Sequence, residues 1–173
     1  LVDSLKQLNI APLAISYEYD PCDFLKAKEF QLKRDNENYK KTQADDMANM
    51  QTGILGYKGR VHYQTGKPVN EWIDEYATLP KGEIFKAIAA RMDREIHANY
   101  RLFPGNYIAA DMLDGKEDFK AHYTADDRQR FEAYLAKKLS LIDVPNKDEA
   151  FLRERILTMY AMPLRNQITA LNP

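Results

Sequence analysis

The sequence has a single cysteine, three histidines and no long apolar run, and each scarcity excludes a class of protein. Cys22 cannot form a disulfide within the chain, which excludes a disulfide-stapled domain and favours a reducing compartment. A membrane-spanning helix needs about 20 consecutive apolar residues, and the sequence offers none. No basic segment followed by an apolar one, as in a signal peptide, opens the chain. We therefore expect a cytoplasmic protein without a transmembrane segment.

Excess charge of either sign is also missing. The chain has 25 basic and 26 acidic residues, for a formal net charge of -1. Nucleic-acid binding depends largely on a basic surface, so no nucleic-acid partner is expected. Hydrophobic residues make up 45% of the 173 positions, which is enough for a packed core. This length fits one ordinary domain or part of a larger one.

Two segments have the character of β-strands. Residues 10–17 are nearly all apolar, and this continuity predicts a strand buried on both faces, as in a parallel sheet covered by helices. Residues 58–64 form the second candidate, with Val61 and Tyr63 on one face. A sheet of two strands leaves most of its edges without partners. We expect further strands from another chain or from a preceding part of a longer protein.

Most of the remaining sequence predicts helices. Asp20 and Pro21 are typical of a helix start, and this helix should run to about Arg34. A second helix is expected from Thr42 to Leu55, ending at Gly56. Apolar stripes at helical spacing predict three later helices: Ile84, Ile88, Met92 and Ile96; Phe131, Leu135, Leu139 and Ile142; Leu152, Ile156, Met159 and Tyr160.

These elements predict an α/β fold class, as an incomplete, mostly helical fragment with two or so strands of a sheet and a C-terminal helical region. We expect residues 1–76 to be the C-terminal part of an α/β domain with inserted helices. Residues 77–173 are expected to form the C-terminal helical region.

One run resembles a known family. Residues 9–23, Asn-Ile-Ala-Pro-Leu-Ala-Ile-Ser-Tyr-Glu-Tyr-Asp-Pro-Cys-Asp, resemble the fourth motif and following segment of the glycerolipid acyltransferases. The nearest likeness is to a Bacteroides-type branch of 1-acyl-glycerol-3-phosphate or glycerol acyltransferases. Residues 29–36, 53–62, 103–107 and 150–153 are similar to that branch as well.

The resemblance implies an enzyme of phospholipid synthesis, which moves a fatty-acyl group from an acyl thioester to a lysophospholipid or glycerol phosphate. In this family a histidine, four residues before an aspartate, is the general base for the acceptor hydroxyl. That motif and a phosphate-binding glycine–arginine motif precede the proline strand, and this sequence contains neither there. We therefore expect no catalytic residue in this chain, which alone would be inactive.

One binding role follows from the resemblance, and a second is suggested by the chemistry of an arginine on the second strand. Pro12, Leu13 and Ile15 of the proline strand would support the acceptor pocket. Arg60 would meet a phosphate if its strand borders the active site, since a guanidinium binds oxyanions with two hydrogen bonds. The favoured alternative is a half-exposed edge strand whose polar residues face solvent.

Cofactor and partners follow from the same family. No bound cofactor or metal is expected, and the acyl donor would be acyl-CoA or acyl carrier protein. The acceptor would reach the parent enzyme as a lysophospholipid or glycerol phosphate. The expected location is the cytoplasm, with contact on the inner face of the cytoplasmic membrane allowed.

The sequence contains one histidine–x4–aspartate pattern, His122 to Asp127, far downstream of the proline strand. In the family, the histidine–x4–aspartate motif precedes the proline strand. A simpler interpretation makes Thr124 a helix cap, with Asp126 and Asp127 in the first turn, where carboxylates favour the helix dipole. We favour the cap.

Four other features have a functional and a structural interpretation. Glu18, Asp20, Cys22 and Asp23 suggest a metal site, but zinc prefers Cys and His ligands, and helix capping is favoured. Cys22 lacks a nearby histidine, which favours a structural thiol over a nucleophile. His97 lies beside an apolar stripe and is interpreted as a boundary residue. The aromatic group could contact lipid, although core packing is favoured: Tyr100, Phe103, Tyr107 and Tyr123.

A second hypothesis comes from another class of protein. The balanced charge, the missing catalytic motifs and the helical second half also suit a non-catalytic helical protein-interaction module.

Overall fold

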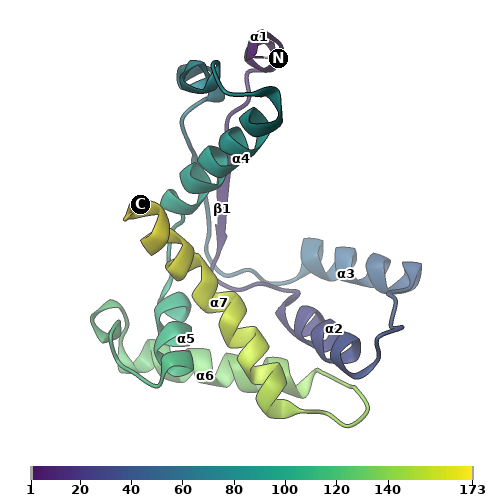
Figure 1. Ribbon diagram of the computed structural model, residues 1–173. Helices are drawn as coiled ribbons and strands as arrows, with labels where there is room; N and C mark the ends of the chain where they lie inside the picture. Colours follow the sequence, from purple (N-terminus) through teal and green to yellow (C-terminus); the bar gives the residue numbers. More distant parts are fainter. Residues whose placement is uncertain (1, 173) are drawn as a thin grey trace. The chain divides into compact units, whose positions relative to one another are not determined.

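The computed structural model describes residues 2–172 and is mostly helical, at 64% (Figure 1). The helices are α1 (Val2–Gln7), α2 (Asp23–Asp35), α3 (Gln43–Leu55), α4 (Lys81–Ala98), α5 (Pro104–Asp114), α6 (Ala125–Ser140) and α7 (Glu149–Leu171). The strands are β1 (Leu13–Tyr17) and β2 (Val61–Thr65), and short 3-10 turns span Val69–Glu71 (η1), Ile73–Tyr76 (η2) and Lys120–His122 (η3). The prediction of a mostly helical fragment with two strands and a C-terminal helix is confirmed.

The chain divides into two compact units, each built from separate segments. The first unit comprises Leu1–Ser16, Val61–Arg101 and Arg165–Pro173. The second comprises Tyr17–Arg60 and Leu102–Leu164. The division expected at residues 76 and 77 stays a prediction, and its outer limits, Leu1 and Pro173, lie outside the described residues.

The core of the first unit packs α4 against the two 3-10 turns that precede it. Ile84 and Ile88 on α4 are 3% and 7% exposed and contact buried Trp72 and Ile73. The first two residues of the apolar stripe predicted for this helix therefore belong to the core. Its last two positions, Met92 and Ile96, are only half-buried.

The larger core, in the second unit, joins α5, α6 and α7. Leu135 of α6 and Leu152 and Ile156 of α7 are fully buried, together with Ile108 of α5. The stripes predicted for both later helices face this core, so spacing correctly identified their buried sides.

The two strands form an antiparallel pair, and the prediction of a doubly buried strand is wrong. Along β1, Ala14 and Ser16 are 1% and 8% exposed, whereas Leu13 and Ile15 are 44% and 42% exposed. The small side chains occupy the packed face, where the Ser16 hydroxyl accepts a hydrogen bond from the Arg101 N–H at 2.9 Å. Apolar composition alone did not reveal that only one face is covered.

Local capping explains where two helices begin. Thr42 and Asp45 form a reciprocal capping box at the start of α3, and Gly56 follows its last residue, as predicted. Thr124 and Asp127 form the same motif at α6. The predicted start of α2 is early by two residues: its N-cap is Cys22 and not Asp20, and Cys22 makes no side-chain capping bond.

Helix α3 has no buried residue. Its apolar side chains Met47, Met50, Ile54 and Leu55 are between 61% and 74% exposed. The helix is therefore amphipathic in sequence, with its apolar side open in this structure.

None of the helices within residues 2–172 is both long and apolar enough to cross a membrane.

Candidate functional site

The three strand residues expected at the acceptor pocket lie at the sheet. Pro12 is buried, and its carbonyl accepts the Gly66 N–H at 2.9 Å just beyond the end of β2. Leu13 and Ile15 lie on the open face of β1. These positions suit apolar contact with another segment or with a substrate, and their role in binding stays a prediction.

Arg60 immediately precedes β2 and is held by Glu18. Its Nη2 lies 2.9 Å from Oε1 of Glu18, its Nε lies 3.0 Å from Oε2, and its backbone N–H donates to Oε2 at 2.9 Å. The hydrogen bonds from Arg60 hold the pKa of Glu18 below its usual range. The guanidinium also lies 5.0 Å from the centre of the Phe103 ring. A phosphate at this position would have to replace Glu18.

The four-residue cluster considered as a metal site is divided among separate partners. Glu18 pairs with Arg60, and Asp20 pairs with Lys26 at 2.5 Å. Asp23 is buried among tyrosines, as described below. Across residues 2–172, no group of three or more His, Cys, Asp or Glu side chains is arranged to hold a metal ion.

The Cys22 thiol is half-buried, with Sγ 3.5 Å from the carbonyl oxygen of Asn49. Burial raises its pKa, and the neighbouring Asp20 carboxylate acts in the same direction. A nucleophilic cysteine needs the opposite shift, because the thiolate is the reactive form. This environment favours the structural interpretation.

The most connected polar group of the second unit centres on Asp23, which has no exposed surface. The hydroxyls of Tyr134 and Tyr160 donate to its Oδ2 at 2.5 and 2.9 Å. Lys138 Nζ lies 3.2 Å from Oδ1. These partners come from α6 and α7, so the carboxylate at the start of α2 links three helices.

Burial dominates the electrostatics of this group. It raises the pKa of Asp23, although the bond from Tyr134 and the charge of Lys138 oppose the rise. Burial also raises the pKa of both tyrosines far above their usual range. The hydroxyls therefore remain protonated donors, which is the state that a buried carboxylate requires.

A small cavity of about 150 Å³ lies beside Tyr160. Its lining residues are Tyr17, Asp20, Asn106, Met159, Tyr160 and Pro163. The Tyr160 hydroxyl is already engaged, because it accepts the Asp20 N–H at 2.9 Å and donates to Asp23. The group therefore joins helices and offers no free acid or base to this cavity.

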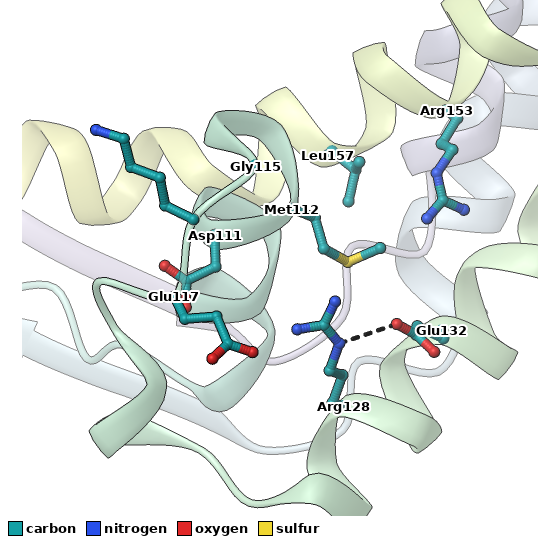
Figure 2. Close-up of a pocket in the computed structure, with 9 residues that line it drawn as sticks. Asp111, Met112, Gly115, Glu117, Arg128, Glu132, Arg153 and Leu157 are labelled. Atoms are coloured by element: carbon teal, nitrogen blue, oxygen red, sulfur yellow. Dashed lines mark hydrogen bonds and ion pairs between the residues drawn. The ribbon is translucent and has the colours of Figure 1, made fainter.

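A larger and more polar cavity, of about 580 Å³, opens where α5, α6 and α7 meet (Figure 2). Its lining residues are Asp111, Met112, Gly115, Lys116, Glu117, Arg128, Glu132, Arg153 and Leu157. Figure 2 shows the guanidinium groups of Arg128 and Arg153 directed toward the same space, with Glu132 beside them. Sequence analysis gave none of these residues a role in a site, because they are separated along the chain; Arg153 entered it only as the last residue of the segment 150–153.

The histidine–x4–aspartate pattern is structural, as the favoured interpretation predicted. Asp127 caps α6 with Thr124, and the hydrogen bonds from Thr124 lower the pKa of Asp127 to about 2. The His122 ring stacks on Tyr107 at 4.4 Å between centroids. Asp127 therefore faces its own helix end and pairs with Arg130 at 2.6 Å.

The aromatic segment contributes mostly to packing. Phe103 is 5% exposed, and Tyr107 and Tyr123 pack against the core of the second unit. The Tyr123 hydroxyl donates to Asp111 at 2.8 Å. In the first unit, His97 is half-buried, and its ring centre lies 5.5 Å from that of Tyr100. These placements favour packing over lipid contact.

Comparison with protein-family models, with curated proteins and with solved structures gave no match to this chain.

Proposed function

We propose that this chain is the C-terminal part of a glycerolipid acyltransferase of the Bacteroides-type branch. The whole enzyme would move a fatty-acyl group from acyl-CoA or acyl carrier protein to a lysophospholipid or glycerol phosphate. The general base and the main phosphate site would come from residues outside this sequence. The chain alone would then be inactive, and its role would be to complete the fold around the acceptor pocket.

The observation that carries the proposal is the open apolar face of the two-stranded sheet. Leu13 and Ile15 of β1 and Val61 of β2 are 44%, 42% and 41% exposed, and Tyr63 beside them is 60% exposed. Two strands alone are marginally stable in water, and apolar strand faces are normally covered. A larger sheet and its helices would cover this face, which agrees with the resemblance of residues 9–23 to the proline strand of the family.

Arg60 fits the proposal on the condition that an acceptor phosphate displaces Glu18. Its side chain is 62% exposed, so an acceptor phosphate could approach it. The Glu18 side chain is 19% exposed and also accepts the Arg60 backbone N–H, so the acceptor phosphate would have to replace the hydrogen bonds that Glu18 now makes. In the enzyme, Glu18 would hold the guanidinium in place until the acceptor binds.

The donor and the location are proposed from the family resemblance. The parent enzyme would work in the cytoplasm, and the amphiphilic character of acyl thioesters and lysophospholipids suits the inner face of the cytoplasmic membrane. Phospholipid synthesis would be its process, and no bound cofactor would take part.

The test is acyl transfer from a labelled acyl thioester to lysophosphatidic acid, measured for this chain and for its full-length parent. We expect activity in the parent alone. In the parent, Ile15→Glu should reduce transfer strongly because it places a charge on the proposed covered face. Ile168→Glu is the matched control, since Ile168 is 43% exposed on α7.

Absence of acyl transfer by the full-length parent, with both acyl-CoA and acyl carrier protein as donors, would contradict the proposal. Activity in the isolated chain would contradict the assignment of catalysis to residues outside it, and His122 would then be the first residue to replace.

A second candidate is a non-catalytic protein-interaction module, favoured by the open apolar side of α3. Under this hypothesis, Ile54→Glu would abolish binding of the partner, and Thr52→Glu on the same helix would not. Acyl transfer by the parent would rule this candidate out as the main function.

A further inference from the structure

The cavity of Figure 2 has two arginines and one apolar wall. Arg128 lies on α6 and Arg153 on α7, while Met112 of α5 and Leu157 of α7 supply apolar surface. All of these residues belong to the second unit. The volume of about 580 Å³ falls within the usual range for small-molecule sites.

The carboxylates around this cavity are already engaged. Asp111 is 2% exposed and accepts the Tyr123 hydroxyl at 2.8 Å and the Phe119 N–H at 3.1 Å. Glu117 accepts Lys120 Nζ at 2.5 Å. Asp111 therefore serves the loop that follows α5, and Glu117 is neutralised by a lysine of η3.

The remaining carboxylate, Glu132, is hydrogen-bonded to only one of the two arginines. Glu132 accepts a hydrogen bond from Arg128 Nε at 3.1 Å, and this bond raises the pKa of Arg128. No hydrogen bond or ion pair joins the Arg153 guanidinium to another residue in the described part of the chain. An exposed guanidinium with five N–H donors thus faces a cavity that already contains a second guanidinium.

We propose that this cavity binds the phosphate group of a small phosphorylated molecule or of a lipid headgroup. Arg153 would donate two parallel hydrogen bonds to the phosphate, and Arg128 would supply the second positive charge. Met112 and Leu157 would contact the apolar part of the ligand. The proposal does not depend on the acyltransferase assignment.

Phosphate fits better than a carboxylate for a geometric reason. The two guanidinium groups come from different helices and approach the space from different sides (Figure 2). A carboxylate satisfies one arginine fork, whereas a phosphate presents at least three acceptor oxygens and can serve two.

The test titrates the full chain with inorganic phosphate at constant ionic strength, with chloride as the reference anion. Binding is followed by calorimetry and by the NMR signals of the arginine Nε–H groups. We expect Arg153→Gln to weaken phosphate binding at least about tenfold, because a hydrogen-bonded charged pair is lost. Lys137→Gln, which removes one exposed charge from α6 outside the cavity, should leave the affinity unchanged.

A second arm uses phosphatidylcholine vesicles with and without phosphatidic acid. Binding of inorganic phosphate that depends on Arg153 would support the proposal with a soluble source. Arg153-dependent binding seen only with phosphatidic acid would support it with a lipid headgroup as the source. Equal affinity of the native chain and the Arg153→Gln variant in both arms would overturn the proposal. The proposal would also be overturned if phosphate bound no more strongly than chloride and the vesicles with phosphatidic acid bound no more strongly than those without it.

Discussion

The Tyr160 hydroxyl donates a 2.9 Å hydrogen bond to Oδ2 of Asp23, a carboxylate with no exposed surface, across 137 residues of sequence. This bond joins the first residue of α2 to the middle of α7. A buried carboxylate without such donors would be strongly destabilising. The stability of the second unit should therefore depend on this pair.

Replacing Tyr160 with phenylalanine tests this dependence. The substitution keeps the ring but removes a donor to Asp23 and an acceptor for the Asp20 N–H. We expect a loss of about 1–3 kcal/mol in the free energy of unfolding, the cost of leaving buried polar groups unsatisfied. Urea-induced unfolding followed by circular dichroism would measure it.

Tyr57→Phe is the control, since the Tyr57 side chain is 76% exposed. It should change stability by less than about 0.5 kcal/mol. Equal effects of the two substitutions would show that the Asp23 network does not stabilise the fold.

The two capping boxes predict different consequences for the same substitution. Thr124→Ala should cost about 1 kcal/mol of global stability, because α6 contributes Phe131, Leu135 and Leu139 to the core. Thr42→Ala should loosen only α3, which buries nothing. Hydrogen exchange of α3 amides should rise in the second variant while its urea midpoint stays unchanged. A lowered midpoint would show that α3 packs more firmly than the structure indicates.

Stability should fall in acid partly through Asp127. Its pKa is about 2 in the folded chain against about 3.9 in an unfolded one, so the native state binds fewer protons between these values. The contribution is complete above about pH 4 and is lost as the pH falls toward 2. Thr124→Ala removes the side-chain hydrogen bond to Asp127, one of the two from Thr124 that lower this pKa, and keeps the bond from the backbone N–H. Stability measured from pH 5 to 2 should therefore decline slightly less steeply in this variant. An unchanged slope would contradict this origin.

Asp23 acts in the opposite direction in the same experiment. Its folded pKa is raised, so the native state binds more protons and its contribution declines as the pH rises. The Thr124→Ala comparison separates the two because it leaves Asp23 and its partners intact.

Two glycines with opposite environments give a further prediction. Gly59 has φ of +64°, and an added Cβ would lie 2.7 Å from Oε2 of Glu18. Gly59→Ala should therefore cost about 1–3 kcal/mol and disturb the pair between Glu18 and Arg60. Gly82, in α4, has open space around its Cα, and Gly82→Ala should stabilise by about 0.5–1 kcal/mol. Thermal unfolding of both variants checks the signs. Destabilisation by both would mean that α4 needs a glycine at this position.

Local features were predictable from the sequence, and distant partners were not. Thr42, Gly56 and Thr124 gave correct helix ends because a cap bonds within about four residues. The apolar stripes gave the correct buried faces because helical spacing is also local. Asp23 was interpreted as a capping carboxylate, since nothing near it in the sequence indicates Tyr134 or Tyr160.

The strand and the polar cavity show the same limit. Residues 10–17 correctly predicted a strand, but its coverage depends on other segments, and Leu13 and Ile15 prove to be exposed. The arginines of the cavity, Arg128 and Arg153, lie on different helices, and the sequence assigned neither of them to a site. Only the folded arrangement of α5, α6 and α7 brings them to one space.

The open side of α3 also makes this helix chemically vulnerable. Met47 and Met50 are 62% and 61% exposed, so oxidants reach their thioether sulfurs readily. Conversion to the sulfoxide would turn apolar side chains into polar ones while the two cores stayed intact. The surface character of α3 would thus change with the redox state of its surroundings, and methionine sulfoxide reductases could restore it.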